Sequence, residues 1–240
     1  MDITNLELKN IRKLKDKKYR KELGLFLVEG AKACEELVNS NYQIKYTLSC
    51  DEKYKHYPNF VLIDYDVLKS IATTDSPQNV ICVSVQPNMQ QISSEGNSLV
   101  LDELQDPGNL GTLIRSALAF NFKNIYLINS VDPFSEKVIR STMGAIFKVN
   151  ICKLTREEFI LNKDKICDFL IGTDLSSIKL EKKELKDRRV AVVIGNEGNG
   201  VSKDMLAVCD KVVTLPMTKE VESLNASVAG SILMYEVFKK

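Results

Sequence analysis

The sequence predicts an α/β protein in which a small α+β domain precedes a larger domain built on a parallel sheet. The chain has 240 residues, 44% hydrophobic and 27% charged, so it can bury a core and has a globular composition. A polar stretch, PNMQQISSEGNS, separates two apolar regions near residue 90. After it, short apolar segments alternate with amphipathic ones, as in parallel strands covered on both faces. We expect domains over 1–87 and 99–240, joined by a linker over 88–98.

Residues 1–87 mix helical and strand patterns. A basic helix is expected over Ile3–Tyr19 and an acidic helix over Ala31–Asn39. Strands are expected at Ile44–Cys50, Phe60–Ile63 and Val80–Val85, where β-branched and aromatic residues gather.

In residues 99–240, strands and helices are expected in alternation. The expected strands are Leu99–Leu101, Ile125–Ile128, Phe169–Gly172, Val190–Ile194 and Val212–Leu215. The expected helices are Leu110–Phe120, Ser135–Phe147, one from Ser202, and a last one from about Asn225 with Leu224, Val228, Ile232 and Tyr235 as its apolar stripe. No apolar run approaches the ~18 residues that span a bilayer, so no membrane association is expected.

The basic residues are concentrated near the start of the chain. The whole chain has 33 basic and 32 acidic side chains, but Lys9–Lys21 holds eight basic residues and one acidic residue. Most charge runs are solvated helix faces. This run is dense and almost single-signed, which favours a phosphate-rich partner such as nucleic acid.

The cysteines and the one histidine argue against metal and disulfide chemistry. The six cysteines are scattered, with no C-x-x-C pair, and His56 is the only histidine. We therefore expect no metal, reduced thiols and a cytoplasmic protein.

Three loops that follow expected strands carry unusual residues. In LDELQDPGNLGTLIR, Pro107-Gly108 forces a turn, Asn109 is an expected helix N-cap, and Arg115 lies one turn into the helix. The loop VIGNEGNGVS has three glycines around Glu197, in a spacing that differs from dinucleotide and P-loop fingerprints. In the third loop, LPMTKEVESLNASVA, a short polar segment leads into the last helix. The ligands of open parallel sheets bind outside the carboxyl ends of the strands, where these three loops begin.

Together, the segments NLGTLIR, VIGNEGNGVS and LPMTKEVESLNASVA resemble the three motifs of the SpoU (TrmH-type) RNA ribose 2′-O-methyltransferases of the SPOUT superfamily. IRSTMGAIFKV, at Ile139–Val149, also resembles this family. FLVEG, at Phe26–Gly30, resembles the L30e-like substrate-binding domain of members that act on ribosomal RNA. The resemblance implies a trefoil knot in the second domain and a homodimer with its active site near the interface.

The resemblance also implies the site residues and the cofactor, S-adenosyl-L-methionine. The implied catalytic residues are Asn109, Arg115, Glu197, Ser223 and Asn225. The implied cofactor-binding residues are Thr173, Gly195, Leu215, Met217 and Leu224. The expected RNA-binding residues are Arg12, Lys13, Lys15, Lys17, Lys18 and Arg140.

Two questions stay open at the level of sequence. Arg115 is either the base that activates the ribose hydroxyl or a cation that holds a phosphate and stabilises the developing alkoxide. The second role needs no deprotonation of a guanidinium. The favoured substrate is 23S ribosomal RNA; the alternatives are transfer RNA and a non-catalytic role in RNA binding or ribosome assembly.

Overall fold

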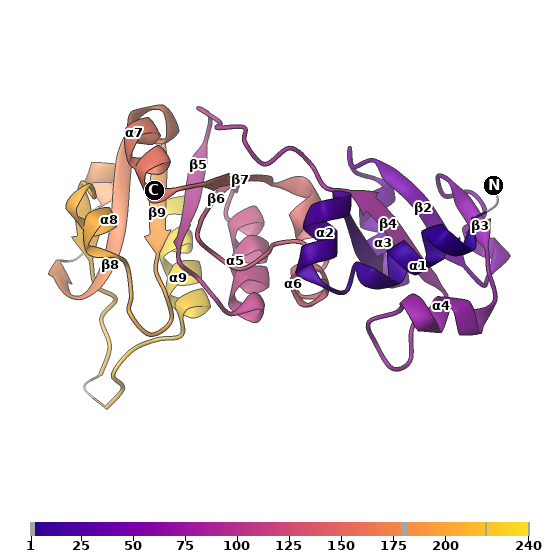
Figure 1. Cartoon of the computed structure of the whole chain (residues 1–240). Helices are drawn as coiled ribbons and strands as arrows, with labels where there is room; N and C mark the ends of the chain where they lie inside the picture. Colours follow the sequence, from indigo (N-terminus) through magenta and orange to yellow (C-terminus); the bar gives the residue numbers. More distant parts are fainter. Residues whose placement is uncertain (1–2, 179–181, 219, 240) are drawn as a thin grey trace. The chain divides into compact units, whose positions relative to one another are not determined.

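The computed structural model describes residues 3–178, 182–218 and 220–239 and divides into two compact units (Figure 1). The first contains the described residues up to Pro87 together with Asp132–Phe147. The second contains Asn88–Val131 and the described residues from Lys148 onward. The expected linker belongs to the second unit, where the Lys153 amide donates to the Met89 carbonyl at 2.8 Å.

The segment Asp132–Phe147 departs from the division expected from the sequence, because it packs within the first unit. The ring of Phe134 lies 4.6 Å from that of Phe26, and Tyr42 lies 5.3 Å from Phe147. Asp132 pairs with Arg20 at 2.9 Å, and both side chains are less than a tenth exposed. Aromatic packing and this buried ion pair hold the segment in place.

Among the described residues of the first unit, four strands form a sheet in the order β1-β4-β2-β3. Only the β2–β3 pair is parallel. The strands are β1 (Leu25–Glu29), β2 (Ile44–Ser49), β3 (Phe60–Leu62) and β4 (Val80–Val85). The helices are α1 (Asn5–Lys13), α2 (Lys17–Leu23), α3 (Ala31–Val38), the short η1 (Glu52–Tyr54), α4 (Tyr65–Ile71), α6 (Glu136–Thr142) and the short η2 (Ala145–Lys148), whose last residue belongs to the second unit.

The basic helix expected over Ile3–Tyr19 is two helices, α1 and α2. Leu14 ends α1 and is buried at 1% exposure, and the side chain of Asp16 caps α2 by accepting from the Lys18 amide at 2.8 Å. A buried apolar residue and an N-cap in succession interrupt the helix. The break also turns Arg20 inward, so one of the eight basic residues in Lys9–Lys21 is structural.

Within the described part of the second unit, six parallel strands follow the order β10-β8-β9-β5-β6-β7, which confirms the predicted parallel sheet. The strands are β5 (Asn97–Asp102), β6 (Phe122–Ile128), β7 (Asn150–Leu154), β8 (Phe169–Ile178), β9 (Val190–Ile194) and β10 (Lys211–Val213). From β5 the chain continues to β6 and β7 on one side of the sheet. The other neighbour of β5 is β9, which comes later in the chain. Ligands of open α/β sheets bind at such a switch point.

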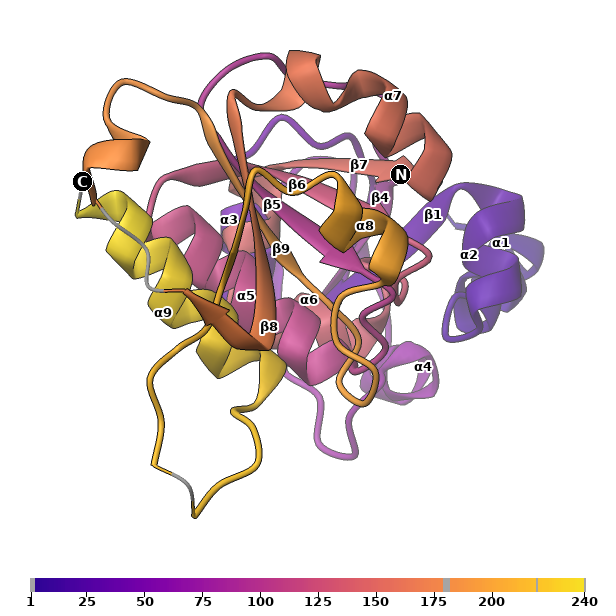
Figure 2. The same cartoon turned by 90° about the vertical axis from the view of Figure 1, so that its left-hand side faces the viewer.

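Helices cover both faces of this sheet (Figure 2). On one face, α5 (Pro107–Ala119) packs against α9 (Ala226–Phe238). On the other lie α7 (Arg156–Ile166) and α8 (Lys203–Ala207), and the short η3 (Lys182–Leu185) precedes β9. Phe159 and Met205 share a core cluster there with strand residues such as Val100 and Val193.

The apolar stripe expected on the last helix faces away from the core. Val228, Ile232 and Tyr235 are exposed, whereas Leu233, Met234 and Val237 are buried. Gly230 explains the rotation of the helix, because a Cβ there would lie 2.5 Å from Leu113 and 3.0 Å from Ile194. The small residue lets α9 approach α5 and the sheet closely. No helix in the described ranges is long and apolar enough to cross a membrane.

Candidate functional site

The three loops singled out in the sequence leave the same edge of the parallel sheet. They follow the carboxyl ends of β5, β9 and β10, and the third leads into α9. All three belong to the second unit. Segments that are far apart in the chain are thus brought together by the strand order.

The glycine-rich loop after β9 is a tight turn. Asn196 and Gly200 exchange two backbone hydrogen bonds of 2.9 Å, and the Asn196 side chain accepts from the Gly198 and Asn199 amides at 3.0 and 3.1 Å. Gly200 has a φ of +69°, and a Cβ on Gly195 would lie 2.1 Å from the Gly200 backbone. The loop therefore requires glycine at these two positions, and it presents its backbone to ligands.

A chain of hydrogen bonds joins the three loops. Asn109 Nδ2 donates to Glu197 Oε1 at 3.1 Å, and Asn225 Nδ2 donates to Asn109 Oδ1 at 3.0 Å. Asn225 Oδ1 in turn accepts from the amides of Ser227 and Val228 at 2.9 and 3.3 Å, which caps α9. Both asparagine amides are therefore engaged in holding the loops together.

Glu197 also accepts from the start of α5. The amides of Gln105 and Asp106 donate to its two carboxylate oxygens at 3.2 and 2.9 Å. Partial burial acts to raise the pKa of Glu197, but the bonds from Asn109 and the backbone amides outweigh it, and the pKa lies below its ordinary value. The carboxylate is held in its charged form.

The prediction from the sequence placed the start of α5 too late in the chain. Asp106, and not Asn109, is the N-cap: its side chain accepts from the Asn109 amide at 2.8 Å. Asn109 is in the first turn and is 8% exposed, so its side chain is free of capping and reaches Glu197. The helix starts earlier because Pro107 fits its first turn.

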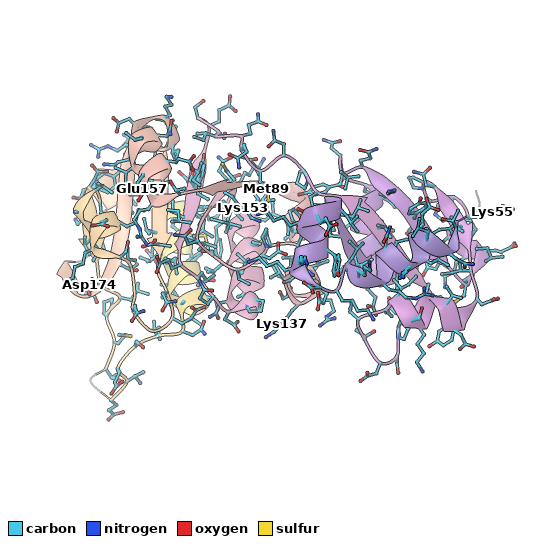
Figure 3. All side chains as sticks on the ribbon, in the orientation of Figure 1. Lys55, Met89, Lys137, Lys153, Glu157 and Asp174 are labelled. Atoms are coloured by element: carbon cyan, nitrogen blue, oxygen red, sulfur yellow. The ribbon has the colours of Figure 1, made fainter. Side chains whose placement is uncertain are left out.

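A cavity of about 420 Å³ opens beside these loops. It is lined by all five expected cofactor-binding residues, Thr173, Gly195, Leu215, Met217 and Leu224, and by Glu197 and Ser223. Asp174, labelled in Figure 3, follows Thr173 on β8 and lies at the same cavity. The cavity combines apolar side chains with backbone and carboxylate groups.

Arg115 stands apart from this hydrogen-bonded group. It is exposed on α5, it does not line the cavity, and it has no hydrogen bond or ion pair with any other described residue. Its guanidinium is available to an external ligand.

The expected RNA-binding residues lie in the first unit and form two groups. Arg12 donates to Ser70 Oγ at 2.8 Å, Lys15 to the Ser70 carbonyl at 3.3 Å, and Arg140 to Thr73 Oγ1 at 2.9 Å. The ammonium groups of Lys13 and Lys18 lie 4.9 and 5.8 Å from the centre of the Tyr19 ring, and Lys17 is exposed. Arg12 and Lys15 thus meet Arg140, which is distant in the chain, at the last turn of α4 and the segment after it.

A parallel sheet with three polar loops joined around a cavity at its carboxyl edge is the arrangement of an α/β protein that binds a small molecule. The model of the SpoU rRNA methylase family matches residues 96–235, and the chain belongs to that family. The model of an MRM3-like substrate-binding domain matches residues 5–82.

Similar proteins share both units. The 23S rRNA (guanosine(2553)-2′-O)-methyltransferase RlmP of Bacillus subtilis is 29% identical over 97% of this chain and 96% of its own length. The AdoMet-bound rRNA methyltransferase of Sinorhizobium meliloti is 28% identical, with a TM-score of 0.88 over 100% of this chain and 96% of its own. A putative RNA methyltransferase of the TrmH family from Porphyromonas gingivalis is 28% identical, with a TM-score of 0.86 over 99% and 98% of the two chains.

Glu197→Gln should destabilise the protein in a pH-dependent way. A neutral amide presents an N–H group to donors that need an acceptor, so we expect the melting temperature at pH 7 to fall by about 2–4 °C. Because the folded pKa is below the ordinary 4.5, the stabilisation is present above pH 4.5 and is lost as the pH falls through the folded value. In thermal melts from pH 7 to 3.5, the difference in melting temperature between the two proteins should therefore narrow as the pH falls below 4.5.

The matched control is Glu222→Gln, an exposed carboxylate at the same cavity that has no hydrogen bond or ion pair with a described residue. This variant should melt with the wild type at every pH. If the difference in melting temperature between Glu197→Gln and the wild type were the same at every pH in this range, the charge of Glu197 would not contribute to the stability of the loops.

Proposed function

We propose that the protein transfers a methyl group from S-adenosyl-L-methionine to a ribose 2′-hydroxyl of 23S ribosomal RNA. The observation that carries the proposal is the hydrogen-bonded chain Glu197–Asn109–Asn225, which joins the three motif loops beside the cavity. Membership of the SpoU family supports methyl transfer, and the similarity to RlmP over 97% of the chain supports 23S rRNA as the substrate.

The cavity fits the proposed cofactor in size and chemistry. Its volume of about 420 Å³ is in the range of small-molecule sites. Leu215, Met217 and Leu224 supply apolar walls, and the turn at Gly195 exposes backbone groups. When bound, S-adenosyl-L-methionine supplies an activated methyl group, and the protein supplies orientation and electrostatics.

The residues of the site divide into positioning and charge-stabilising groups. Asn109, Asn225 and Glu197 fix the loops, because their hydrogen-bonding groups already hold one another. Ser223 lines the cavity and is exposed to a substrate. Arg115 holds the phosphate next to the target ribose and stabilises the developing alkoxide.

The test is methyl transfer from labelled S-adenosyl-L-methionine to separated ribosomal and transfer RNA pools, followed by mapping of the modified ribose. Label in 23S rRNA at a 2′-O position is expected. Label confined to transfer RNA would support the transfer RNA alternative, and cofactor binding without transfer to either pool would support a non-catalytic RNA-binding role. The cytoplasmic location and the trefoil knot stay predictions.

Arg115→Ala should separate cofactor binding from methyl transfer. Because Arg115 is outside the cavity lining, the dissociation constant for S-adenosyl-L-methionine should stay within about twofold of the wild type. Loss of one charge-stabilising group should lower kcat by about 10²–10³-fold. Calorimetric titration and labelled transfer measure the two quantities, and a fully active variant would remove Arg115 from the mechanism.

Neutralising Lys13, Lys15, Lys17 and Lys18 should flatten the salt dependence of RNA binding. Each phosphate contact contributes roughly 0.7–0.9 to the slope of log affinity against log salt, so the slope should fall by about 2–3 if most of these lysines touch phosphate. Filter binding from 50 to 300 mM salt measures it. The matched control neutralises Lys32, Lys45, Lys53 and Lys55, which are exposed in the same unit. If the two variants show equal slopes of log affinity against log salt, Lys13, Lys15, Lys17 and Lys18 do not contact phosphate.

The exposed stripe of α9 is the surface we propose for the homodimer. Val228, Ile232 and Tyr235 are 39–46% exposed, and the Tyr235 ring lies 5.5 Å from that of Phe120. Ile232→Glu should convert a particle of twice the chain mass into a monomer in sedimentation experiments, because a charge is costly in an apolar interface. Leu161→Glu, at an isolated exposed leucine on α7, should stay dimeric. A monomeric wild type would refute the dimer.

A further inference from the structure

The glycine-rich loop is anchored from behind by residues that do not line the cavity. Asp102, the last residue of β5, is 1% exposed, and its Oδ2 accepts from the Ser202 amide at 2.9 Å. The next residue, Glu103, accepts through its carbonyl from Asn196 Nδ2 at 3.0 Å. Asp102 and Glu103, which are consecutive at the end of β5, thus hold the last and the first residue of the loop from Asn196 to Ser202.

One guanidinium bridges these two anchors. Arg156, the first residue of α7, donates from Nη2 to Asp102 Oδ1 at 2.9 Å and to Glu103 Oε1 at 2.7 Å. It supplies the ion-pair partner that the buried Asp102 carboxylate requires. Without Arg156, this carboxylate would remain buried with the Ser202 amide as its hydrogen-bond donor.

We propose that Arg156, acting through Asp102 and Glu103, is a positioning residue that sets the shape of the cofactor loop. This inference rests on the proposed function of the cavity as the S-adenosyl-L-methionine site. The loop has little slack, since a Cβ at Gly195 would already lie 2.1 Å from Gly200. A shift at Asn196 or Ser202 therefore reaches the cavity wall directly.

The chain contains a matched control for a purely structural role. Arg189 pairs with Asp168 through its Nε at 3.1 Å and also donates to the carbonyls of Ser94 and Lys165 at 3.0 and 2.7 Å. Asp168 and Arg189 directly precede β8 and β9, so this pair is at the amino edge of the same sheet. The two arginines are similarly exposed, at 26% for Arg189 and 19% for Arg156.

The experiment compares the full-length wild type with Arg156→Gln, Arg156→Lys and Arg189→Gln. Calorimetry gives the dissociation constant for S-adenosyl-L-methionine, thermal melts give stability, and labelled transfer gives kcat and the cofactor KM. Arg156→Gln should raise the dissociation constant and KM by roughly tenfold, with a smaller change in kcat. Arg189→Gln should lower the melting temperature at least as much and leave the dissociation constant within about twofold.

Arg156→Lys should restore binding to within about threefold of the wild type. A single nitrogen makes both contacts, and Arg156 Nε has no partner among the described residues, so an ammonium group can replace the guanidinium. Rescue of this kind is not expected from a residue that only fills space.

Glu103→Gln provides a second variant if Arg156→Gln does not fold, because the Glu103 side chain is 45% exposed. It should raise the dissociation constant by about threefold. The inference is overturned if folded Arg156→Gln, or Glu103→Gln in its place, binds S-adenosyl-L-methionine as tightly as the wild type. It is also overturned if Arg189→Gln loses as much affinity for S-adenosyl-L-methionine as Arg156→Gln does. If the wild type itself does not bind the cofactor, the proposed function fails and the inference fails with it; wild-type binding with unaffected variants refutes the inference alone.

Discussion

The site depends on one carboxylate that joins two loops on adjacent strands. Glu197 follows β9 and accepts from the amides of Gln105 and Asp106, which follow β5. These amides belong to the N-cap of α5 and the residue before it, where the helix dipole favours an anion. Glu197 therefore satisfies donors that would otherwise need water, and it fixes Asn109 and, through it, Asn225. The third loop and α9 are connected to the same carboxylate.

Close approach of backbones is the second requirement, and it explains why glycine stands at two distant positions. At Gly195 the turn after β9 leaves no room for a side chain, and at Gly230 the helix α9 lies against Leu113 and Ile194. The tight packing at Gly230 turns the apolar face of Ile232 and Tyr235 outward. The same contact that brings Asn225 to Asn109 thus leaves an apolar surface for a second subunit in the proposed dimer.

The parts of the fold that depend on local pattern were predictable from the sequence. Continuous apolar runs located β9 and β4, and the alternation of strands and helices placed the three loops at the carboxyl edge of one sheet. Features that depend on contacts between distant residues were not predictable in this way. In the sequence nothing distinguishes Arg20 from its basic neighbours, but in the structure it pairs with Asp132, 112 residues away. Similarly, the segment Asp132–Phe147 follows a strand of the second unit but packs in the first. Asp106 and Asn109 are both good N-caps, and Pro107 favours Asp106; the contact with Glu197, 88 residues away, shows what the Asn109 side chain does instead.

The near balance of 33 basic and 32 acidic side chains conceals local concentrations of charge of opposite sign. Arg12, Lys15 and Arg140 gather in the first unit, where phosphate is the proposed ligand. Asp174, Glu197 and Glu222 line the cavity in the second. Carboxylates would repel an RNA backbone, but they favour a ligand whose sulfonium and ammonium groups are positive. The cavity is therefore suited electrostatically to the proposed methyl donor, and the first unit to its acceptor, so a net charge near zero is compatible with a polyanionic substrate.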